Sequence, residues 1–171
     1  MPSDSGTIDA CCCEGIARLR VRGRAQAFQC PSLRQFVEDS LAGDATEVRI
    51  DLSECEHFDS TFLGTLLHLR RTRCATGGAI LTLVNPSGEC RQLLKRMGAT
   101  RLFNFASTRD DEPQFDWAAL GELESEACGY DFKRNVVTAH QELAEVDGPM
   151  QEQYRVIAQM AADDLASAQG K

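Results

Sequence analysis

The feature that most constrains the fold is an alternation of short apolar runs with segments of helical periodicity. The runs EVRIDLS (residues 47–53) and AILTLV (residues 79–84) have the length and apolar content of buried strands. Each is followed by a segment with helical spacing of apolar residues, and the first of these ends at Gly77 and Gly78 and the second at Gly98. Strands that alternate with helices in this way predict a β-sheet packed against helices, the α/β class.

A β-hairpin is predicted near the start of the chain. The strand-like runs of residues 7–13 and 16–23 meet at Glu14 and Gly15, where glycine permits a tight reversal. In the second run four arginines alternate with apolar residues at the strand period of two, which favours a solvated strand face over a basic binding stripe. These arginines are Arg18, Arg20, Arg22 and Arg24.

Two further elements complete the expected order. A helix is predicted between Pro31 and Gly43, because proline is favoured at a helix start and glycine just beyond a helix end. The run RLFNF, residues 101–105, predicts a last strand. The expected order of elements is therefore β-β-α-β-α-β-α-β.

The stretch HFDSTFLGTLL, residues 57–67, places three capping residues in front of a run of leucines. Asp59, Ser60 and Thr61 can each accept a hydrogen bond from the free N–H groups of a helix start, and one such cap is enough. The helix is expected to begin at or just after Asp59 and Ser60. Apolar residues form one side of it, and the other side is expected to be polar. The apolar residues are Phe62, Leu63, Leu66 and Leu67, and the polar ones are His68, Arg70, Arg71 and Arg73.

Residues 7–105 resemble the STAS domain, the fold of bacterial anti-sigma factor antagonists and of the cytoplasmic ends of sulfate transporters. VRIDLSECEHFDSTFLGTLL is similar to the pattern of a hydrophobic residue and D-L-S, then D-S-S/T-x-L-G. GGAILTLVNPSGECRQLLKRMGATRLF is similar to the second signature of the family in order and spacing. One position departs from the pattern, because the family commonly has glycine where this chain has Phe62, and this alters the surface beside Ser60.

The resemblance implies a phosphorylation switch. In such antagonists the serine that matches Ser60 is phosphorylated by a partner that is both a serine kinase of the histidine-kinase-like ATPase fold and an anti-sigma factor. The unmodified form binds that partner and frees the sigma factor, and a PP2C-type phosphatase belongs to the same pathway. Thr61 is a possible second phosphoacceptor. The expected partner-binding residues are Asp59, Ser60, Thr61, Phe62 and Gly64.

Two other interpretations stay open beside this one. Asp59 and Ser60 could simply cap the helix, and the protein could then be a scaffold or adaptor in a larger assembly. An enzyme could use Cys55 with His57 and Asp59, since such residues support acyl transfer. In an extended segment, however, these three residues lie on one side without an oxyanion pocket, so we expect no catalytic residues.

Charge and cysteine spacing exclude other classes. The formal net charge is -8, and residues 106–171 carry 5 Lys and Arg against 14 Asp and Glu, so nucleic acid is not an expected partner. No stretch approaches the roughly 20 apolar residues of a membrane helix, and the start of the chain does not resemble a signal peptide. We expect a cytoplasmic protein with no membrane contact. The 8 cysteines contain no C-x-x-C pair, so neither a metal ion nor a cofactor is expected.

The C-terminal third is predicted to be an acidic helical extension, residues 111–171, that follows a STAS domain at residues 1–110. Residues 115–126 and 130–146 show helical patterning, and a last helix with an apolar stripe follows an interruption at residues 148–149. The extension is expected to pack on its own domain, because an exposed apolar stripe is unfavourable in a free chain. An amphipathic surface for a partner is the alternative.

Overall fold

The computed structural model describes residues 5–108, 113–120 and 126–170. Its strands are β1 (Thr7–Cys13), β2 (Ile16–Ala25), β3 (Glu47–Phe58), β4 (Ile80–Val84), β5 (Asn104–Ala106) and β6 (Ala118–Ala119). Its α-helices are α1 (Cys30–Ala42), α2 (Ser60–Leu69), α3 (Ala75–Gly77), α4 (Gly88–Arg96), α5 (Glu126–Ala144) and α6 (Gln151–Gln169). A π-helical turn, Arg70–Cys74, joins α2 to α3, and short 3-10 turns occupy Ala27–Gln29 and Thr100–Leu102.

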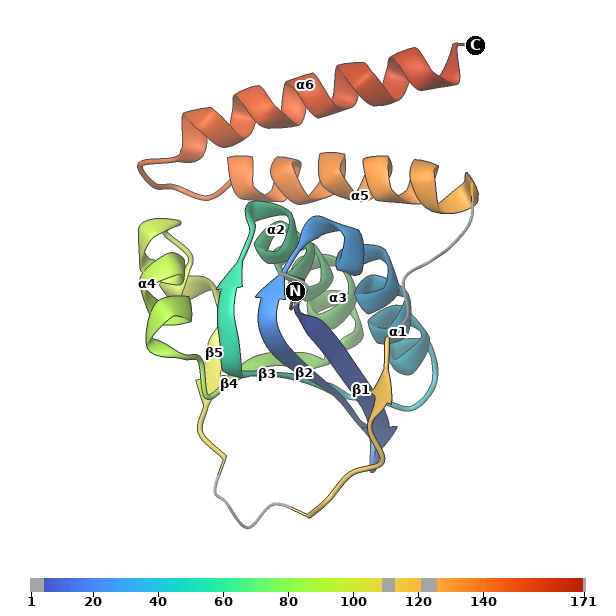
Figure 1. Cartoon of the computed structure of the whole chain (residues 1–171), viewed down its shortest axis with the longest axis vertical. Coiled ribbons are helices and arrows are strands. Elements are labelled where there is room, and N and C mark those ends of the chain that lie inside the picture. Colours follow the sequence, from blue (N-terminus) through green and yellow to red (C-terminus); the bar gives the residue numbers. More distant parts are fainter. Residues whose placement is uncertain (1–4, 109–112, 121–125, 171) are drawn as a thin grey trace.

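The strands form one mixed sheet in the order β5-β4-β3-β2-β1-β6, and helices flank it (Figure 1). β1 and β2 are antiparallel, whereas β2, β3, β4 and β5 pair in parallel. The turn between β1 and β2 has positive φ angles of 53° at Glu14 and 72° at Gly15, the geometry that matches the twist of a two-residue hairpin. The predicted hairpin and the predicted α/β fold with flanking helices are both confirmed.

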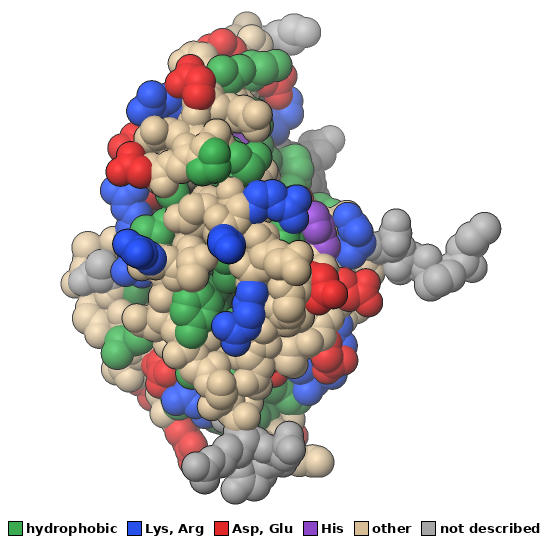
Figure 2. Space-filling view, turned by 90° about the vertical axis from the view of Figure 1, so that its left-hand side faces the viewer, with side chains coloured by type: hydrophobic (Ala, Val, Ile, Leu, Met, Phe, Trp, Pro, Cys, Tyr) green, Lys and Arg blue, Asp and Glu red, His purple; other side chains and the backbone are tan. Residues whose placement is uncertain are grey.

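One face of the sheet supplies the core. Alternate residues of the central strands are buried there against residues of α1, α2 and α4, as the strand period of two requires. The strand residues are Ala17, Leu19 and Val21 of β2, Val48, Ile50 and Leu52 of β3, and Leu81 and Leu83 of β4. On the side of the molecule that carries α4, acidic and basic side chains are interspersed over the surface (Figure 2).

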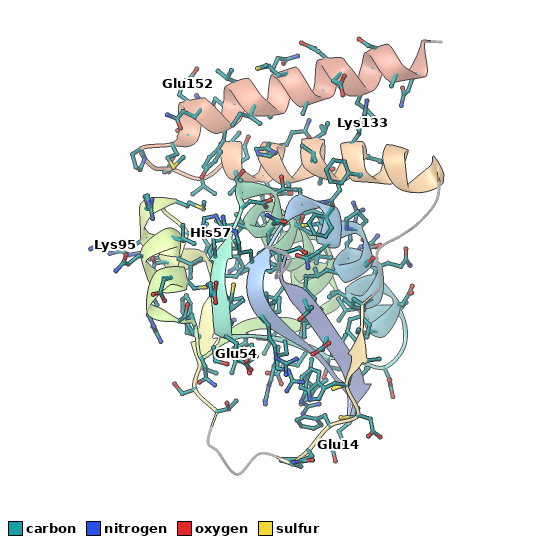
Figure 3. All side chains as sticks on the ribbon, in the orientation of Figure 1. Glu14, Glu54, His57, Lys95, Lys133 and Glu152 are labelled. Atoms are coloured by element: carbon teal, nitrogen blue, oxygen red, sulfur yellow. The ribbon has the colours of Figure 1, made fainter. Side chains whose placement is uncertain are left out.

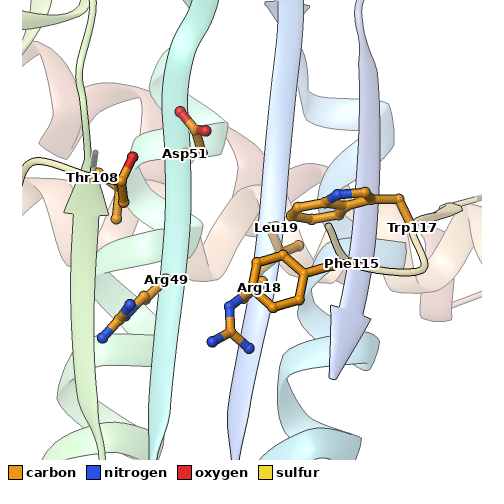
Figure 4. A pocket seen from close by; sticks show the side chains of 8 residues that line it. Arg18, Leu19, Arg49, Asp51, Thr108, Phe115 and Trp117 are labelled. Carbon is orange, nitrogen blue, oxygen red and sulfur yellow. The ribbon is translucent and has the colours of Figure 1, made fainter. Parts of the chain in front are cut away.

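The opposite face of the sheet carries the alternating arginines, and part of it is covered. The Arg18 guanidinium lies 4.1 Å from the centre of the Phe115 ring, and that of Arg20 lies 4.4 Å from the Trp117 ring. Arg18 is only 8% exposed. Arg18, Phe115 and Trp117 line a shallow pocket on this face together with Asp51 (Figure 4). The prediction of a solvated strand face is therefore wrong for Arg18 and Arg20, because cation–π stacking holds the segment after residue 112 across them.

Three predicted elements differ from the structure. β3 continues past residue 53 to Phe58, because the second half of β2 pairs with it, Ala25 opposite Phe58. The run 101–105 is a 3-10 turn up to Leu102 and a strand only from Asn104. The helix predicted for residues 115–126 is wrong for residues 115–120, since Ala118 and Ala119 form a strand that pairs with β1; residues 121–125 lie outside the described part.

The last two helices form an antiparallel pair above the rest of the fold, which we call the α5–α6 hairpin (Figure 1). The break predicted at residues 148–149 does separate α5 from α6. Lys133 of α5 reaches Asp164 of α6 at 3.0 Å, and Figure 3 shows Lys133 between the two helices. α5 in turn rests on α2. Within the described residues, no helix is both long enough and apolar enough to cross a bilayer.

Candidate functional site

Asp59 is the cap of α2. Its Oδ1 accepts a hydrogen bond of 2.8 Å from the backbone N–H of Phe62, and its Oδ2 accepts one of 2.8 Å from the N–H of Ala27. One carboxylate thus caps the helix and also ties its start to the 3-10 turn that follows β2, and its negative charge lies at the positive end of the helix dipole. The cap needs no help from Ser60, the next residue.

The hydroxyl of Ser60 meets a residue that is 80 positions away in the sequence. Its Oγ lies 3.0 Å from Nε2 of His140 on α5. The other ring nitrogen of His140, Nδ1, lies 2.9 Å from the carbonyl oxygen of Val136, which can only accept. Nδ1 therefore carries the proton, and in the neutral imidazole Nε2 accepts from the Ser60 hydroxyl. Ser60 is half-buried, and His140 is buried.

α2 and α5 approach each other backbone to backbone beside this pair. A side chain at Gly64 would collide with the backbone of Ala139, so the glycine is required by the close contact. One turn away, Asn135 Nδ2 donates to Thr65 Oγ1 at 2.9 Å, and Thr65 donates to the carbonyl of Thr61 at 2.7 Å. Buried polar groups are hydrogen-bonded here, as burial demands.

An ion-pair cluster lies at the far end of the same contact. Glu142 of α5 places Oε2 2.6 Å from Nη1 of Arg71 and Oε1 3.1 Å from Nδ1 of His68. The Glu142 side chain is 14% exposed and that of Arg71 is 53% exposed, so the pair lies at the rim of the interface. Four groups of α5 therefore contact α2 along its length. They are the imidazole of His140, the backbone of Ala139, the amide of Asn135 and the carboxylate of Glu142.

The structure places the predicted site residues at different depths. Asp59 and Ser60 are half-buried, whereas Thr61, Phe62 and Gly64 are buried. Phe62 points into the core, where its ring lies 5.9 Å from that of Phe58. The residues expected on the polar side lie at the C-terminal end of α2 and just beyond it, where Arg71 and Arg73 are exposed and His68 contacts Glu142 of α5. Sequence reasoning missed the partners on α5, which are Asn135, Ala139, His140 and Glu142.

The alternative cysteine nucleophile is poorly placed for chemistry. Cys55 is 1% exposed, and its thiol donates at 3.4 Å to the carbonyl of His57 rather than meeting the imidazole. Contact with Cys90 and burial raise the pKa of the Cys55 thiol, which keeps it protonated. Within the described residues, no three His, Cys, Asp or Glu side chains gather as a set that could hold a metal ion.

Comparisons with known proteins concern the part of the chain that carries this site. Residues 14–104 match the family model described as "Mlab, STAS domain". The matched region contains α2 and stops before α5 and α6. No curated protein matches the chain.

Solved structures of anti-sigma factor antagonists share the fold. An antagonist from Mycobacterium paratuberculosis is 23% identical with a TM-score of 0.53, over 64% of this chain and 92% of that one. SpoIIAA in its unphosphorylated form is 15% identical with a TM-score of 0.53, over 63% of this chain and 90% of that one. The Bacillus cell fate determinant SpoIIAA in the phosphorylated form is 15% identical with a TM-score of 0.50, over 63% and 94%.

Proposed function

We propose that this protein, which belongs to the STAS domain family, is a phosphorylation-controlled protein-binding switch of the anti-sigma factor antagonist type, with Ser60 as the phosphoacceptor. Its partner is a serine kinase of the histidine-kinase-like ATPase fold that also acts as an anti-sigma factor, and a PP2C-type phosphatase resets the switch. The protein is not an enzyme and acts in the cytoplasm. The partner-binding surface comprises Asp59, Ser60, Thr61 and Gly64, with Phe62 beneath it.

The observation that carries this proposal is that Asp59 and Ser60 make different contacts at the start of α2. Asp59 makes two hydrogen bonds to backbone N–H groups at the helix start, so the Ser60 hydroxyl is not needed as a cap. Ser60 is half-buried whereas Thr61 is 6% exposed, which favours Ser60 as the modified residue. A phosphate on Ser60 would lie at the N-terminus of α2, where free N–H groups and the helix dipole stabilise negative charge.

The same phosphate would prevent partner binding. A partner surface that accepts a neutral hydroxyl would have to bury a charge of about -1.5 to -2 without a counter-charge. A loss of about 3 kcal/mol from this desolvation weakens binding more than a hundredfold. The fold itself should be little affected, because the charge lies at a helix end that can hold it.

The test begins with a pull-down from the source cell, using the unmodified protein as bait in the presence of ATP or ADP. The captured kinase is then incubated with the protein and ATP, and phosphopeptides are mapped by mass spectrometry. We expect phosphate on Ser60, retained binding by Ser60→Ala and weak binding by Ser60→Asp. Ser53→Asp, which adds the same charge at an exposed position of β3, is the matched control and should bind normally. Phosphate found only elsewhere, or tight binding by Ser60→Asp, would refute the assignment.

A second function is favoured by one observation, the existing bond between Ser60 and His140. If that bond is permanent, α2 is an internal surface and the protein is an adaptor that binds a larger assembly through another face. In that case Ser60→Ala and Ser60→Asp would both capture the same proteins as the unmodified chain, and no phosphate would appear on Ser60.

A further inference from the structure

The proposed switch surface is already occupied by the chain itself. His140 accepts from Ser60, the Ala139 backbone closes over Gly64, and Glu142 pairs with Arg71. α6 supports this arrangement from behind, since the Tyr154 ring lies 6.5 Å from the His140 ring. The α5–α6 hairpin therefore lies where a partner of α2 would have to bind.

Three occupants of this surface exclude one another. With 3.0 Å between Ser60 Oγ and His140 Nε2, the two atoms are in direct hydrogen-bond contact and a phosphoryl group cannot fit between them. With Gly64 against the Ala139 backbone, no second helix can reach α2 either. The docked hairpin, a phosphate on Ser60 and a bound partner are therefore alternatives.

The residues on the side of α2 that α5 covers are of types that suit a contact that can open. Small or polar residues of α2 meet α5 at positions 60, 64, 65 and 68, along one face of the helix. The larger apolar residues, such as Leu66 and Phe62, belong to the core. If the hairpin leaves, water can replace its hydrogen bonds to this face. Leu143, Ala144 and Tyr154 of the hairpin also belong to the hydrophobic core, so their exposure opposes opening and favours the closed state. The family match also ends before α5 begins.

We propose that the α5–α6 hairpin is a reversible intramolecular cover of the α2 surface, which must leave before Ser60 is phosphorylated or a partner binds. This proposal rests on the proposed function and adds its regulation. It also defines the chemistry of the partner, because the partner must replace the contacts of α5. Such a partner presents a helix with a small residue opposite Gly64, a hydrogen-bond acceptor for Ser60 and a carboxylate for His68 and Arg71.

The test measures the accessibility of position 60 in the full-length chain. Ser60→Cys places a thiol at the helix start, and the alkylation of this introduced thiol by iodoacetamide is followed peptide by peptide with mass spectrometry. Native cysteines serve as internal standards, because Cys12 is exposed whereas Cys30 and Cys90 are buried. Two changes on the hairpin, each made in this background, should open it without altering α2. Ala139→Leu adds bulk at a fully buried contact, and Glu142→Arg replaces the carboxylate beside His68 and Arg71 with a cation.

We expect the introduced thiol to react more slowly than Cys12 in the Ser60→Cys reference protein. In both hairpin variants it should react at least about tenfold faster than in the reference, which corresponds to about 1.4 kcal/mol in the opening equilibrium. Gln141→Arg, a cation at an exposed neighbouring position, should leave the rate within about twofold of the reference. Cys30 and Cys90 should stay protected throughout.

Three outcomes would overturn the proposal: an introduced thiol as reactive as Cys12 in the reference, an unchanged rate in both hairpin variants, or a rise accompanied by equal exposure of Cys30 and Cys90. The last would mean that the hairpin leaves only when the domain unfolds. Because no kinase or partner is used, this result stands apart from the phosphorylation test. The proposal of a reversible cover and the assignment of Ser60 as the phosphoacceptor can therefore be refuted independently of each other.

Discussion

A Cβ atom placed on Gly64 would collide with the carbonyl oxygen of Ala139. Two helices from distant parts of the sequence therefore touch through their backbones, and this contact brings Ser60 and Thr65 of α2 within hydrogen-bond distance of α5. The fit of the α5–α6 hairpin on the STAS domain depends on the absence of a side chain at this position.

Gly64→Ala should lower the free energy of unfolding by about 1 to 3 kcal/mol, because the added methyl group meets rigid backbone rather than a flexible side chain. Urea unfolding followed by circular dichroism measures this. Gly77→Ala is the matched control, since nothing lies within 4 Å of its added methyl group. The control should be neutral or stabilising by less than about 1 kcal/mol. Equal effects of the two substitutions would contradict the close contact.

Asp59→Ala should destabilise the protein by about 2 to 4 kcal/mol, because it removes the bonds to the N–H groups of both Phe62 and Ala27. Ser60→Ala should lose only about 1 kcal/mol, the typical value of one hydrogen bond, here the one to His140. Denaturant midpoints of the two variants give the comparison. A larger loss for Ser60→Ala would mean that the serine, not the aspartate, secures the helix.

Leu66→Ala should lower stability by about 2 to 5 kcal/mol, because Leu66 is 1% exposed and its removal leaves a cavity in the core. The α2 surface under α5 should keep its shape. Thermal unfolding reports the loss, and an unchanged midpoint would place Leu66 outside the core.

Stability should fall in alkaline solution. Burial raises the pKa of the Cys30 thiol from 9.0 to about 12. The stabilisation from keeping this thiol neutral is fully present below pH 9 and is lost as the pH rises toward 12, at about 1.4 kcal/mol per pH unit. Urea titrations with a reductant at pH 8 and pH 10.5 measure the slope. Cys30→Ala should reduce it, whereas Cys12→Ala, at an exposed position, should not.

Trp117 is the single tryptophan, so its fluorescence reports on the segment that crosses the arginine face. Arg20→Ala removes the guanidinium that lies 4.4 Å from the ring. We expect the emission of Trp117 to shift to longer wavelength, because the ring loses this cover and becomes more hydrated. Arg24→Ala on the same strand is the control and should leave the spectrum unchanged. An identical spectrum for Arg20→Ala would mean that the stacking does not persist in solution.

Much of the sheet and its helices follow from local pattern. The hairpin turn is visible in Glu14 and Gly15, and the start of α2 is visible in Asp59, because turn and cap chemistry act between neighbours in the sequence. The extension of β3 to Phe58 is not visible in this way, because its second half is defined by pairing with β2 and not by a regular alternation of buried and exposed residues.

The candidate site is only half predictable. Asp59 and Ser60 stand out in the sequence because the helix start has more capping residues than it needs. His140 cannot be recognised in this way, because it joins the site only through its contact with Ser60, 80 positions away in the sequence. The burial of Thr61, Gly64 and Thr65 is also hidden in the sequence, since residues of this kind occur equally on exposed helix faces. A useful signal is their spacing, because a stripe of small residues on one side of a helix permits the close approach of another helix.

The attachment of the α5–α6 hairpin to its own domain by the polypeptide chain has a quantitative consequence. An intramolecular contact has an effective concentration set by the tether, so diluting the protein does not change how often α2 is covered. A separate partner has no such advantage, and its apparent affinity is reduced by the fraction of molecules in which α2 is open. If the hairpin is a cover, the concentration of the partner in the cell, rather than that of this protein, determines when the partner replaces the hairpin on α2.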